Sequence, residues 1–458
     1  MIYLVLFLII FIILAYPIFL QKDNIRFMNF VELLEYNIKL FLINNAGLTD
    51  INKRGEYVLE YMTNDPQLIK FHRRMRRKYG KLISTYMITK SHNYYILDTE
   101  LTKSILKDSP KLFSAGKLKE DFFKLFMPKN VGITKCLKTT NCPWKRRRKF
   151  NEDALGTKRD IELFKCLPDI ISRHIAKPLL NISDFKNMSY KIIADITYGN
   201  NGKDASIIKE FTSNMRNENF LKSKFHKEYI EHLHQHYNTK NKCSLLYYAN
   251  LYKNDPIDII DNQIPHWFVP FVFMTQYLIP NLLCSIINFR DIYDKIIIEI
   301  SKPGFDILAN NTYLHYCVIE HIRLFNTINV NIQRTVNKDM IYHGYKFKAG
   351  DQLFILFSSI LRDGKLFDKP DSYIPERWIG KTVEEQDKVF GVGPQQCPSK
   401  RISPHYYKAM LYQLLSNYKY TSALPKLTSR ELHIVNPYRI KLTVSSKNLS
   451  PVHSVSKG

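Results

Sequence analysis

The sequence predicts a mainly helical α+β protein with small β-sheets, preceded by one N-terminal transmembrane helix. The helical prediction rests on long stretches without strand patterning at 160–253, 262–289 and 400–417. Short runs rich in β-branched and aromatic residues are confined to a few places, which limits the sheets to small ones. With 45% hydrophobic residues among its 458, the chain can fill a large core.

The first element is the apolar run 2–20, whose 19 uncharged residues approach the ~20 that a helix needs to cross a bilayer. The run lacks the basic start and the small-residue cleavage site of a signal peptide. The nearest basic residues, Lys22 and Arg26, follow it, so the positive-inside rule places the rest of the chain in the cytoplasm. We therefore expect a single-pass signal anchor in a membrane like that of the endoplasmic reticulum, a connector over 21–70 and one domain over 71–458.

The next elements build a small N-terminal sheet. Residues 71–80 form a basic helical pattern closed by a glycine, which suits the position just after a helix. Two strand-like runs, 82–89 and 94–98, follow with a short polar segment between them, a pattern typical of a hairpin. The segment 99–107 is expected to be a short helix.

Residues 262–289 run for 28 positions without a charge, counting His266 as neutral. By length alone this stretch could be a second transmembrane helix. The competing interpretation, which we favour, is a helix buried on all sides in a large core. Three prolines, Pro265, Pro270 and Pro280, predict kinks or breaks in either case.

The last third of the chain mixes helices and strands. A helix over 313–326 places Glu320 and Arg323 on one face, because they are three residues apart. Strand-like pieces surround residues 343–351, and 352–358 has the composition of a buried strand. Residues 425–444 alternate enough to form a terminal β-ribbon.

Net charge limits the kinds of binding partner that we expect, and the cysteine pattern indicates the redox state of the compartment. The net charge of +25 favours acidic surfaces, unless it is only a solvated basic face. The basic run 145–149 lacks interleaved aromatic residues and a known nucleic-acid-binding fold, so we expect no nucleic-acid partner. The seven cysteines are scattered, without CxxC or zinc-ligand spacing, which predicts a reducing compartment and no disulfide framework.

One glycine-punctuated loop, 390–399, delivers a single cysteine ahead of a helical run. Gly391 and Gly393 allow a tight turn and a close approach of the backbone to a flat ligand. Cys397, held near backbone N–H groups and a helix N-terminus, is favoured as a thiolate. Thiolate is one of the few protein ligands for a haem iron. An inert buried cysteine in a Gly/Pro turn is the other interpretation, and the loop alone leaves both open.

Several motifs, taken in order, resemble the cytochrome P450 family. The loop that begins Phe390-Gly391-Val392-Gly393 and reaches Cys397 is similar to its haem-binding loop, and Glu320-His321-Ile322-Arg323 to its ExxR motif. Pro375-Glu376-Arg377-Trp378 resembles its PERF segment, and the stretch from Trp144 to Arg148 its WxxxR motif. The resemblance covers about residues 70–445 and implies the P450 fold.

The resemblance also implies a haem cofactor (iron protoporphyrin IX) and a role for each matched residue. Cys397 would be the axial iron ligand, and Phe390, Gly391 and Gly393 would lie against the haem. Trp144 and Arg148, one helical turn apart, would meet a haem propionate. A structural network of buried charges would consist of Glu320, Arg323 and Arg377. The basic neighbours of Arg148 would face an acidic redox partner.

Three departures from the family pattern are visible. Gln395 and Ser399 stand where the family usually has arginine and glycine, so a propionate loses a charge-assisted hydrogen bond. Residues 270–275 carry no acid where the family has an acid–alcohol pair, which leaves Thr275 as the candidate proton relay. The span from Trp144 to Thr275 is also short for the family.

The function that follows is a membrane-anchored haem-thiolate monooxygenase. It would take electrons from a reductase and insert one oxygen atom from O2 into a small apolar substrate. Two alternatives stay open: a P450-fold isomerase or dehydratase of peroxides, which needs no proton relay, and a degenerate, non-catalytic haem or interaction protein.

Overall fold

A computed structural model describes residues 26–27, 73–78, 82–85, 93–136, 142–326, 332–355, 357–431 and 435–445. The predicted anchor over 2–20 and nearly all of the predicted connector lie outside these described residues. The chain divides into two units: one combines 1–120, 327–370 and 391–396, and the other 121–326, 371–390 and 397–458. The described part is mostly helical with small sheets, which agrees with the predicted α+β class.

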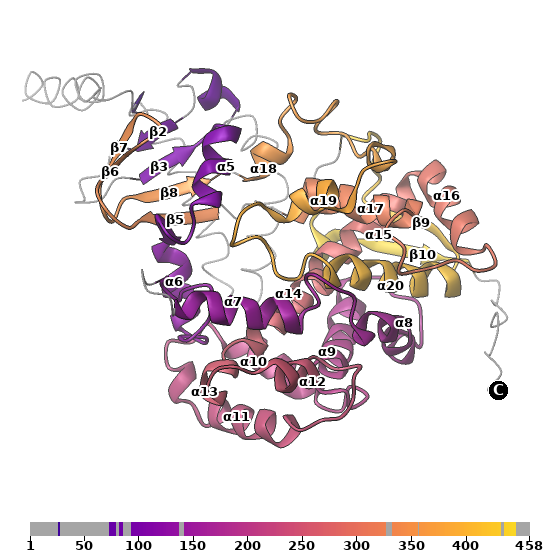
Figure 1. Cartoon of the computed structure of the whole chain (residues 1–458). Helices are drawn as coiled ribbons and strands as arrows, with labels where there is room; N and C mark the ends of the chain where they lie inside the picture. The colour runs from indigo at the N-terminus through magenta and orange to yellow at the C-terminus, as the bar shows by residue number, and fades with distance from the viewer. Residues whose placement is uncertain are drawn as a thin grey trace, which may run out of the picture. The chain divides into compact units, whose positions relative to one another are not determined.

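The first unit is built on a sheet that has six strands among the described residues (Figure 1). The predicted hairpin is present, because β2 (Leu82–Thr85) pairs antiparallel with β3 (Asn93–Ile96). In spatial order the strands are β1 (Arg26–Phe27), β2, β3, β8 (Gln352–Ile355), β5 (Ile332–Val336) and β4 (Phe113–Ala115). The parallel pairing of β3 with β8 joins segments more than 250 residues apart, which no local pattern predicts.

The helix α5 (Thr99–Lys107) has the predicted bounds because its start and its apolar face are both specified locally. The side chain of Asp98 caps it, accepting a hydrogen bond from the Leu101 amide at 2.9 Å. Leu101, Ile105 and Leu106 then pack with the sheet residues in one core. A second hairpin joins β6 (Met340–Tyr342) to β7 (Tyr345–Phe347), and a short helix, α18, spans Phe357–Leu361. The chain passes between the units within α6 (Lys117–Lys124).

The second unit is helical. Its helices up to the long apolar segment are α7 (Pro143–Ala154), α8 (Glu162–His174), α9 (Ile182–Tyr198), α10 (Ala205–Asn214), α11 (Lys224–His236), α12 (Leu245–Tyr252) and α13 (Ile257–Ile260), with a short 3-10 turn at Phe220–Lys222. The elements that follow are α14 (Ile264–Phe273), α15 (Ile279–Asn288), α16 (Arg290–Ile300), α17 (Tyr313–His321), α19 (Val383–Gln386) and α20 (Ile402–Asn417). Short 3-10 turns span Pro375–Trp378, Asp387–Phe390 and Pro437–Arg439.

The terminal ribbon is present but begins earlier than expected. Strand β9 (Tyr420–Leu424) pairs antiparallel with β10 (Lys441–Val444). Residues 425–440, which the sequence placed inside the ribbon, contain the connection between the two strands. Polar residues that alternate in a loop imitate strand patterning, and this explains the difference.

The long apolar segment is a buried helix rather than a lipid-facing one. The largely helical stretch Ile257–Asn288 is, among the described residues, the one candidate for a membrane span by length and composition. However, 83% of its most apolar window is buried inside the protein. A π-helical turn at Met274–Leu278 interrupts it between Pro270 and Pro280, where missing amide groups prevent regular pairing.

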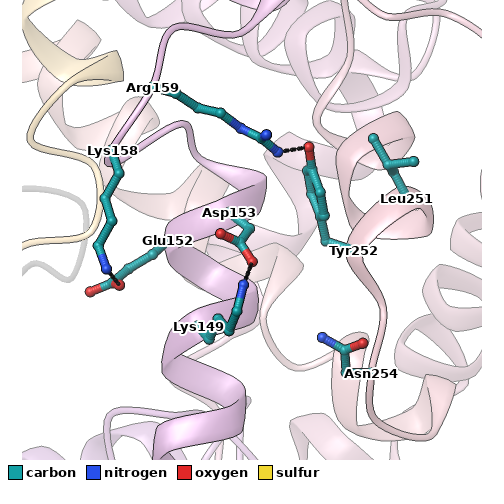
Figure 2. Close-up of a pocket in the computed structure, with 8 residues that line it drawn as sticks. All are labelled: Lys149, Glu152, Asp153, Lys158, Arg159, Leu251, Tyr252 and Asn254. Carbon is teal, nitrogen blue, oxygen red and sulfur yellow. Dashed lines mark hydrogen bonds and ion pairs between the residues drawn. The ribbon is translucent and has the colours of Figure 1, made fainter.

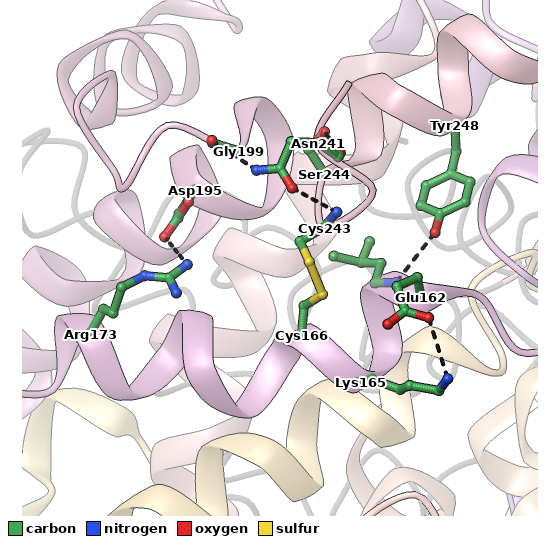
Figure 3. Close-up of a disulfide and its surroundings, with 11 residues drawn as sticks. Glu162, Lys165, Cys166, Arg173, Asp195, Gly199, Asn241, Cys243, Ser244 and Tyr248 are labelled. Carbon is green, nitrogen blue, oxygen red and sulfur yellow. Dashed lines mark hydrogen bonds and ion pairs between the residues drawn. A yellow bond between two sulfur atoms is a disulfide. The ribbon is translucent and has the colours of Figure 1, made fainter. Parts of the chain in front are cut away.

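The cysteine prediction was wrong, because the structure pairs Cys136 with Cys142 and Cys166 with Cys243 as disulfides. Figure 3 shows how the second pair meets: Cys166 lies on α8, and Cys243 lies in the turn before α12. Asn241 fixes that turn by donating to the Gly199 carbonyl at 3.0 Å. Partners 77 residues apart are brought together by packing, so spacing rules could not reveal them. The expectation of a reducing compartment loses this support.

Candidate functional site

Cys397 sits at the end of the predicted loop, five residues before α20 begins. Its backbone amide donates to the Phe390 carbonyl at 3.1 Å, which closes the turn within the second unit. Its Sγ lies 3.1 Å from the Ser399 hydroxyl, and the side chain is partly exposed. Phe390 is buried at the end of its 3-10 turn. The Ser399 hydroxyl is thus placed to donate a hydrogen bond to the sulfur.

The two loop glycines adopt backbone conformations that other residues rarely take, with φ of 96° at Gly391 and 81° at Gly393. Their surroundings differ. A Cβ at Gly393 would lie 2.3 Å from the carbonyl oxygen of Leu106 in the same unit, whereas a Cβ at Gly391 would meet open space. Gly393 is therefore required for packing, and the space beside Gly391 is free. The Gln396 side chain adds a bond to the Gly391 carbonyl at 2.8 Å.

Pairing and burial distinguish Cys397 from the other six cysteines. All seven cysteines lie in the described part of the chain, and four are paired as disulfides. Of the other three, Cys284 and Cys317 are buried. Burial raises the pKa of the Cys284 thiol to about 12 and that of Cys317 well above its usual value. Only Cys397 combines a free thiol with access for a ligand, so the donor set fits one axial thiolate.

The predicted charge network is brought together around Glu320, whose side chain is fully buried on α17. Arg323 binds both of its carboxylate oxygens at 2.8 Å. Arg377 adds a contact of 2.9 Å, and the Trp378 indole N–H donates at 3.0 Å. The Ile374 amide completes the set at 3.0 Å. Every charge in the cluster has a partner, which makes its burial tolerable.

Trp378 is a contributor that the sequence reasoning missed. It ends the motif Pro375–Trp378, in which the resemblance assigns a role to Arg377 alone. An indole N–H is a donor that needs a partner when buried, and Trp378 is almost fully buried. A buried tryptophan next to a charged motif was the signal that could have identified it.

Trp144 and Arg148 both lie on α7, one turn apart as predicted. Trp144 is buried with Val131 and Cys142. Arg148 is largely buried, and its Nε donates to Glu152 at 2.7 Å. It is thus not a solvated member of the basic run. A propionate contact would share this guanidinium with Glu152.

Much of the basic run is paired inside the protein. Arg146 forms an ion pair with Asp255, and Arg147 donates to the Thr134 hydroxyl at 2.6 Å. Burial lowers the pKa of Arg147, and the nearby Asp255 carboxylate opposes that shift. These pairings leave less free positive charge for a docking partner than the sequence suggested.

A pocket of about 580 Å³ lies beside α7, and Figure 2 shows the residues that line it. Lys149 pairs with Asp153, Lys158 lies 3.5 Å from Glu152, and Arg159 contacts the Tyr252 hydroxyl. The lining carries three cations and two carboxylates, and its charged side chains are engaged with one another or with Tyr252. No predicted site residue lines this pocket.

Thr275 lies in the π-helical turn and is completely buried. Its hydroxyl donates to the Phe271 carbonyl at 2.7 Å and lies 2.5 Å from the Tyr406 hydroxyl on α20. Since the Thr275 proton is held by Phe271, Tyr406 is the donor of the second bond. The candidate relay is thus a satisfied hydrogen-bonding group in this structure.

Comparison with known proteins agrees with the motifs. Residues 290–444 match the family model described as Cytochrome P450. The chain is 30% identical over 150 residues to cytochrome P450 3A15 of Cavia porcellus, covering 30% of each protein. It is also 30% identical over 104 residues to the mitochondrial cholesterol side-chain cleavage enzyme of Hypanus americanus, covering 22% of this chain and 20% of that enzyme.

The match to these relatives is therefore partial, spanning less than a third of their length. The family-model match begins at residue 290 and includes Glu320, Arg323, Arg377 and Cys397. Proteins of this family bind haem.

Proposed function

We propose that this chain is a haem-thiolate monooxygenase, because residues 290–444 match the family model described as Cytochrome P450. It inserts one oxygen atom from O2 into a small apolar organic substrate, with electrons from a reductase. The observation that carries the proposal is the state of Cys397: a free, partly exposed thiol beside a hydroxyl donor, in a chain whose six other cysteines are paired or buried.

In this proposal Cys397 holds the haem iron through its sulfur. The bound haem supplies O2 activation, which the thiolate promotes by donating electron density. Ser399, at 3.1 Å from the sulfur, moderates that donation with a hydrogen bond. Phe390 would add a buried apolar side chain at the start of the loop, and Gly391 would leave space for a flat ligand. Trp144 and Arg148 bind a propionate, with Glu152 sharing the arginine.

Glu320, Arg323 and Arg377 act as positioning residues. They tie α17 to the 3-10 turn Pro375–Trp378, which precedes the cysteine loop in the chain. Removing any member takes a charged partner away from the buried groups that remain. The cluster therefore fixes the segment that delivers Phe390 and Cys397.

Thr275 is the proposed proton relay. The two hydrogen bonds of its hydroxyl show which bond must break before it can deliver a proton. Its hydroxyl receives a hydrogen bond from Tyr406 and passes one to the Phe271 carbonyl. To deliver a proton elsewhere, the side chain must release Phe271. Tyr406 would keep its hydrogen bond to the freed Thr275 hydroxyl and hold it in position, while the proton itself has to come from the group that Thr275 turns toward.

The proposal includes location and partners. Residues 2–20 anchor the chain in a membrane like that of the endoplasmic reticulum, with the haem domain on the cytoplasmic side. The electron donor is a reductase whose acidic groups face the basic run 145–149. The substrate is small and apolar.

The test uses the full chain purified in detergent. Reduced with dithionite and exposed to carbon monoxide, it should show the red-shifted Soret band of thiolate ligation. NADPH consumption that requires an added P450 reductase supports the monooxygenase. Well-folded protein that takes up no haem contradicts it and leaves a non-catalytic protein.

One observation favours a second candidate, a peroxide isomerase or dehydratase. The Thr275 hydroxyl is occupied, and residues 270–275 carry no acid. Such an enzyme needs no delivered proton. Turnover of an organic hydroperoxide without reductase or NADPH would select it over the monooxygenase.

A further inference from the structure

Three metal-ligating side chains converge where α10 begins, outside the residues discussed above. Asp204 directly precedes α10, and His232 and His236 lie on α11. The histidines are four residues apart, so both imidazoles project from the same face of the helix. Asp204 meets them from the neighbouring element, and all three side chains are partly exposed. One face of a helix and one fixed carboxylate thus form a three-donor cluster.

The separations of the donor atoms suit one small cation. The Asp204 Oδ2 lies 2.9 Å from the His232 Nε2 and 3.7 Å from the His236 Nε2. All three donor atoms lie within 4.8 Å of one another. Ligands bound at about 2.1 Å with tetrahedral angles stand about 3.4 Å apart. Small side-chain rotations would bring the three donors to that spacing without moving the backbone.

Supporting hydrogen bonds orient two of the donors as a metal site requires. The His236 Nδ1–H donates to the His232 carbonyl at 3.0 Å, which leaves the lone pair of Nε2 for a ligand. Asn200 donates from its side-chain amide to Asp204 and holds the carboxylate in place. The ring of Tyr198 packs edge-on against His232 and tilted against His236, which walls one side of the cluster.

The types of donor atom also suit a cation. The set consists of two imidazole nitrogens and one carboxylate oxygen. Nitrogen-rich sets of this kind favour Zn²⁺ over Mg²⁺ or Ca²⁺, which prefer all-oxygen sites.

We propose that Asp204, His232 and His236 bind one Zn²⁺ ion, with a fourth position left for water. The ion would tie the start of α10 to the last turns of α11. This site is independent of the haem-thiolate proposal, because it shares no residue with the cysteine loop. Without metal, the same side chains form only the hydrogen-bonded His–Asp pairs described above.

The same helix supplies a matched control. His234 lies between the two proposed ligands in sequence and forms its own pair with Asp261, at 2.6 Å. It is therefore a histidine on α11 with a carboxylate partner but outside the cluster. Replacing it perturbs helix and charge similarly, without removing a proposed ligand.

The experiment is calorimetric titration of ZnCl2 into the full chain in detergent, stripped of metal, at pH 7.5. We expect a saturable site of one equivalent that also gives a tetrahedral visible spectrum with Co²⁺. His236→Gln and Asp204→Asn should each weaken Zn²⁺ binding at least about 100-fold, beyond the ~10–100-fold typical of outer-shell partners. His234→Gln should bind as the unmodified chain does.

Thermal unfolding keeps the test decisive if a variant is less stable. Zn²⁺ should raise the melting temperature of the unmodified chain and of His234→Gln, but not of His236→Gln, because a metal stabilises only a fold that binds it. The proposal is overturned if no one-equivalent site exists in the unmodified chain. It is also overturned if His236→Gln retains the site or if His234→Gln loses it.

Discussion

The buried polar groups are paired differently in two parts of the chain, residues 142–289 and residues 290–444. In 290–444, Glu320 is surrounded by fixed donors from Arg323, Arg377 and Trp378, and the motifs stand where the resemblance expects them. In 142–289, the long helix contains a π turn at Met274–Leu278 and no acid at 270–275, and Thr275 bonds to Tyr406. The charge cluster resembles the family's pattern, whereas the cysteine loop departs from it at Gln395 and Ser399 and the long helix departs from it by carrying no acid at 270–275.

The largest effect is expected at Glu320, which tests whether 290–444 is held by its charge cluster. Glu320→Ala leaves Arg323 and Arg377 buried without their carboxylate and should lower the free energy of unfolding by about 3–5 kcal/mol. Thermal unfolding of the full chain in detergent, followed by circular dichroism, measures it. Glu384→Ala, on an exposed part of α19, is the control and should change little. Equal stability of both variants would contradict a structural role for the cluster.

The two loop glycines test whether close packing also holds the cysteine loop in place. Gly393→Ala combines left-handed strain with a collision against the Leu106 carbonyl, so we expect a loss of about 2–4 kcal/mol. Gly391→Ala meets open space and should cost only the strain, about 1–2 kcal/mol. Thermal unfolding and haem content measure both. If Gly391→Ala is the more damaging, the packing assigned to Gly393 is wrong.

Thr275 and Tyr406 test the hydrogen bond that joins the two regions. Thr275→Val and Tyr406→Phe each break it, leave one buried hydroxyl without that partner, and should destabilise the fold by about 1–3 kcal/mol. Only Thr275→Val removes the proposed relay. The fraction of NADPH electrons recovered in product should therefore fall at least several-fold in Thr275→Val and less in Tyr406→Phe. Unchanged coupling in Thr275→Val would exclude this residue as the relay.

The smallest expected effect concerns acid stability. Burial lowers the pKa of His321 to about 3 in the folded chain, against about 6.5 when unfolded. Between these values the unfolded chain binds a proton that the folded chain does not, so stability is complete above pH 6.5 and falls toward pH 3. His321→Phe should flatten this fall by about 1 kcal/mol at pH 5.5. Unfolding measured from pH 7.5 to 4.5 checks it; an unchanged slope would contradict the assignment.

Features that depend on neighbouring residues could be predicted from local patterns in the sequence. Asp98 and the spacing of Leu101 and Ile105 define α5, and the sequence motif around Glu320 led to a cluster that the structure brings together. Long-range packing was beyond such patterns. The pairing of β3 with β8, the Cys166–Cys243 disulfide and the meeting of Asp204 with His232 all join segments that only the folded chain brings near.

The most direct test of the central claim compares two cysteine variants of the full chain. Cys397→Ala and Cys284→Ala are each reduced with dithionite and exposed to carbon monoxide. Cys284 is a buried thiol outside the loop, so its variant should keep the red-shifted Soret band, while Cys397→Ala should lose it. A red-shifted band that survives in Cys397→Ala would show that another residue holds the iron and would contradict the proposed function at its foundation.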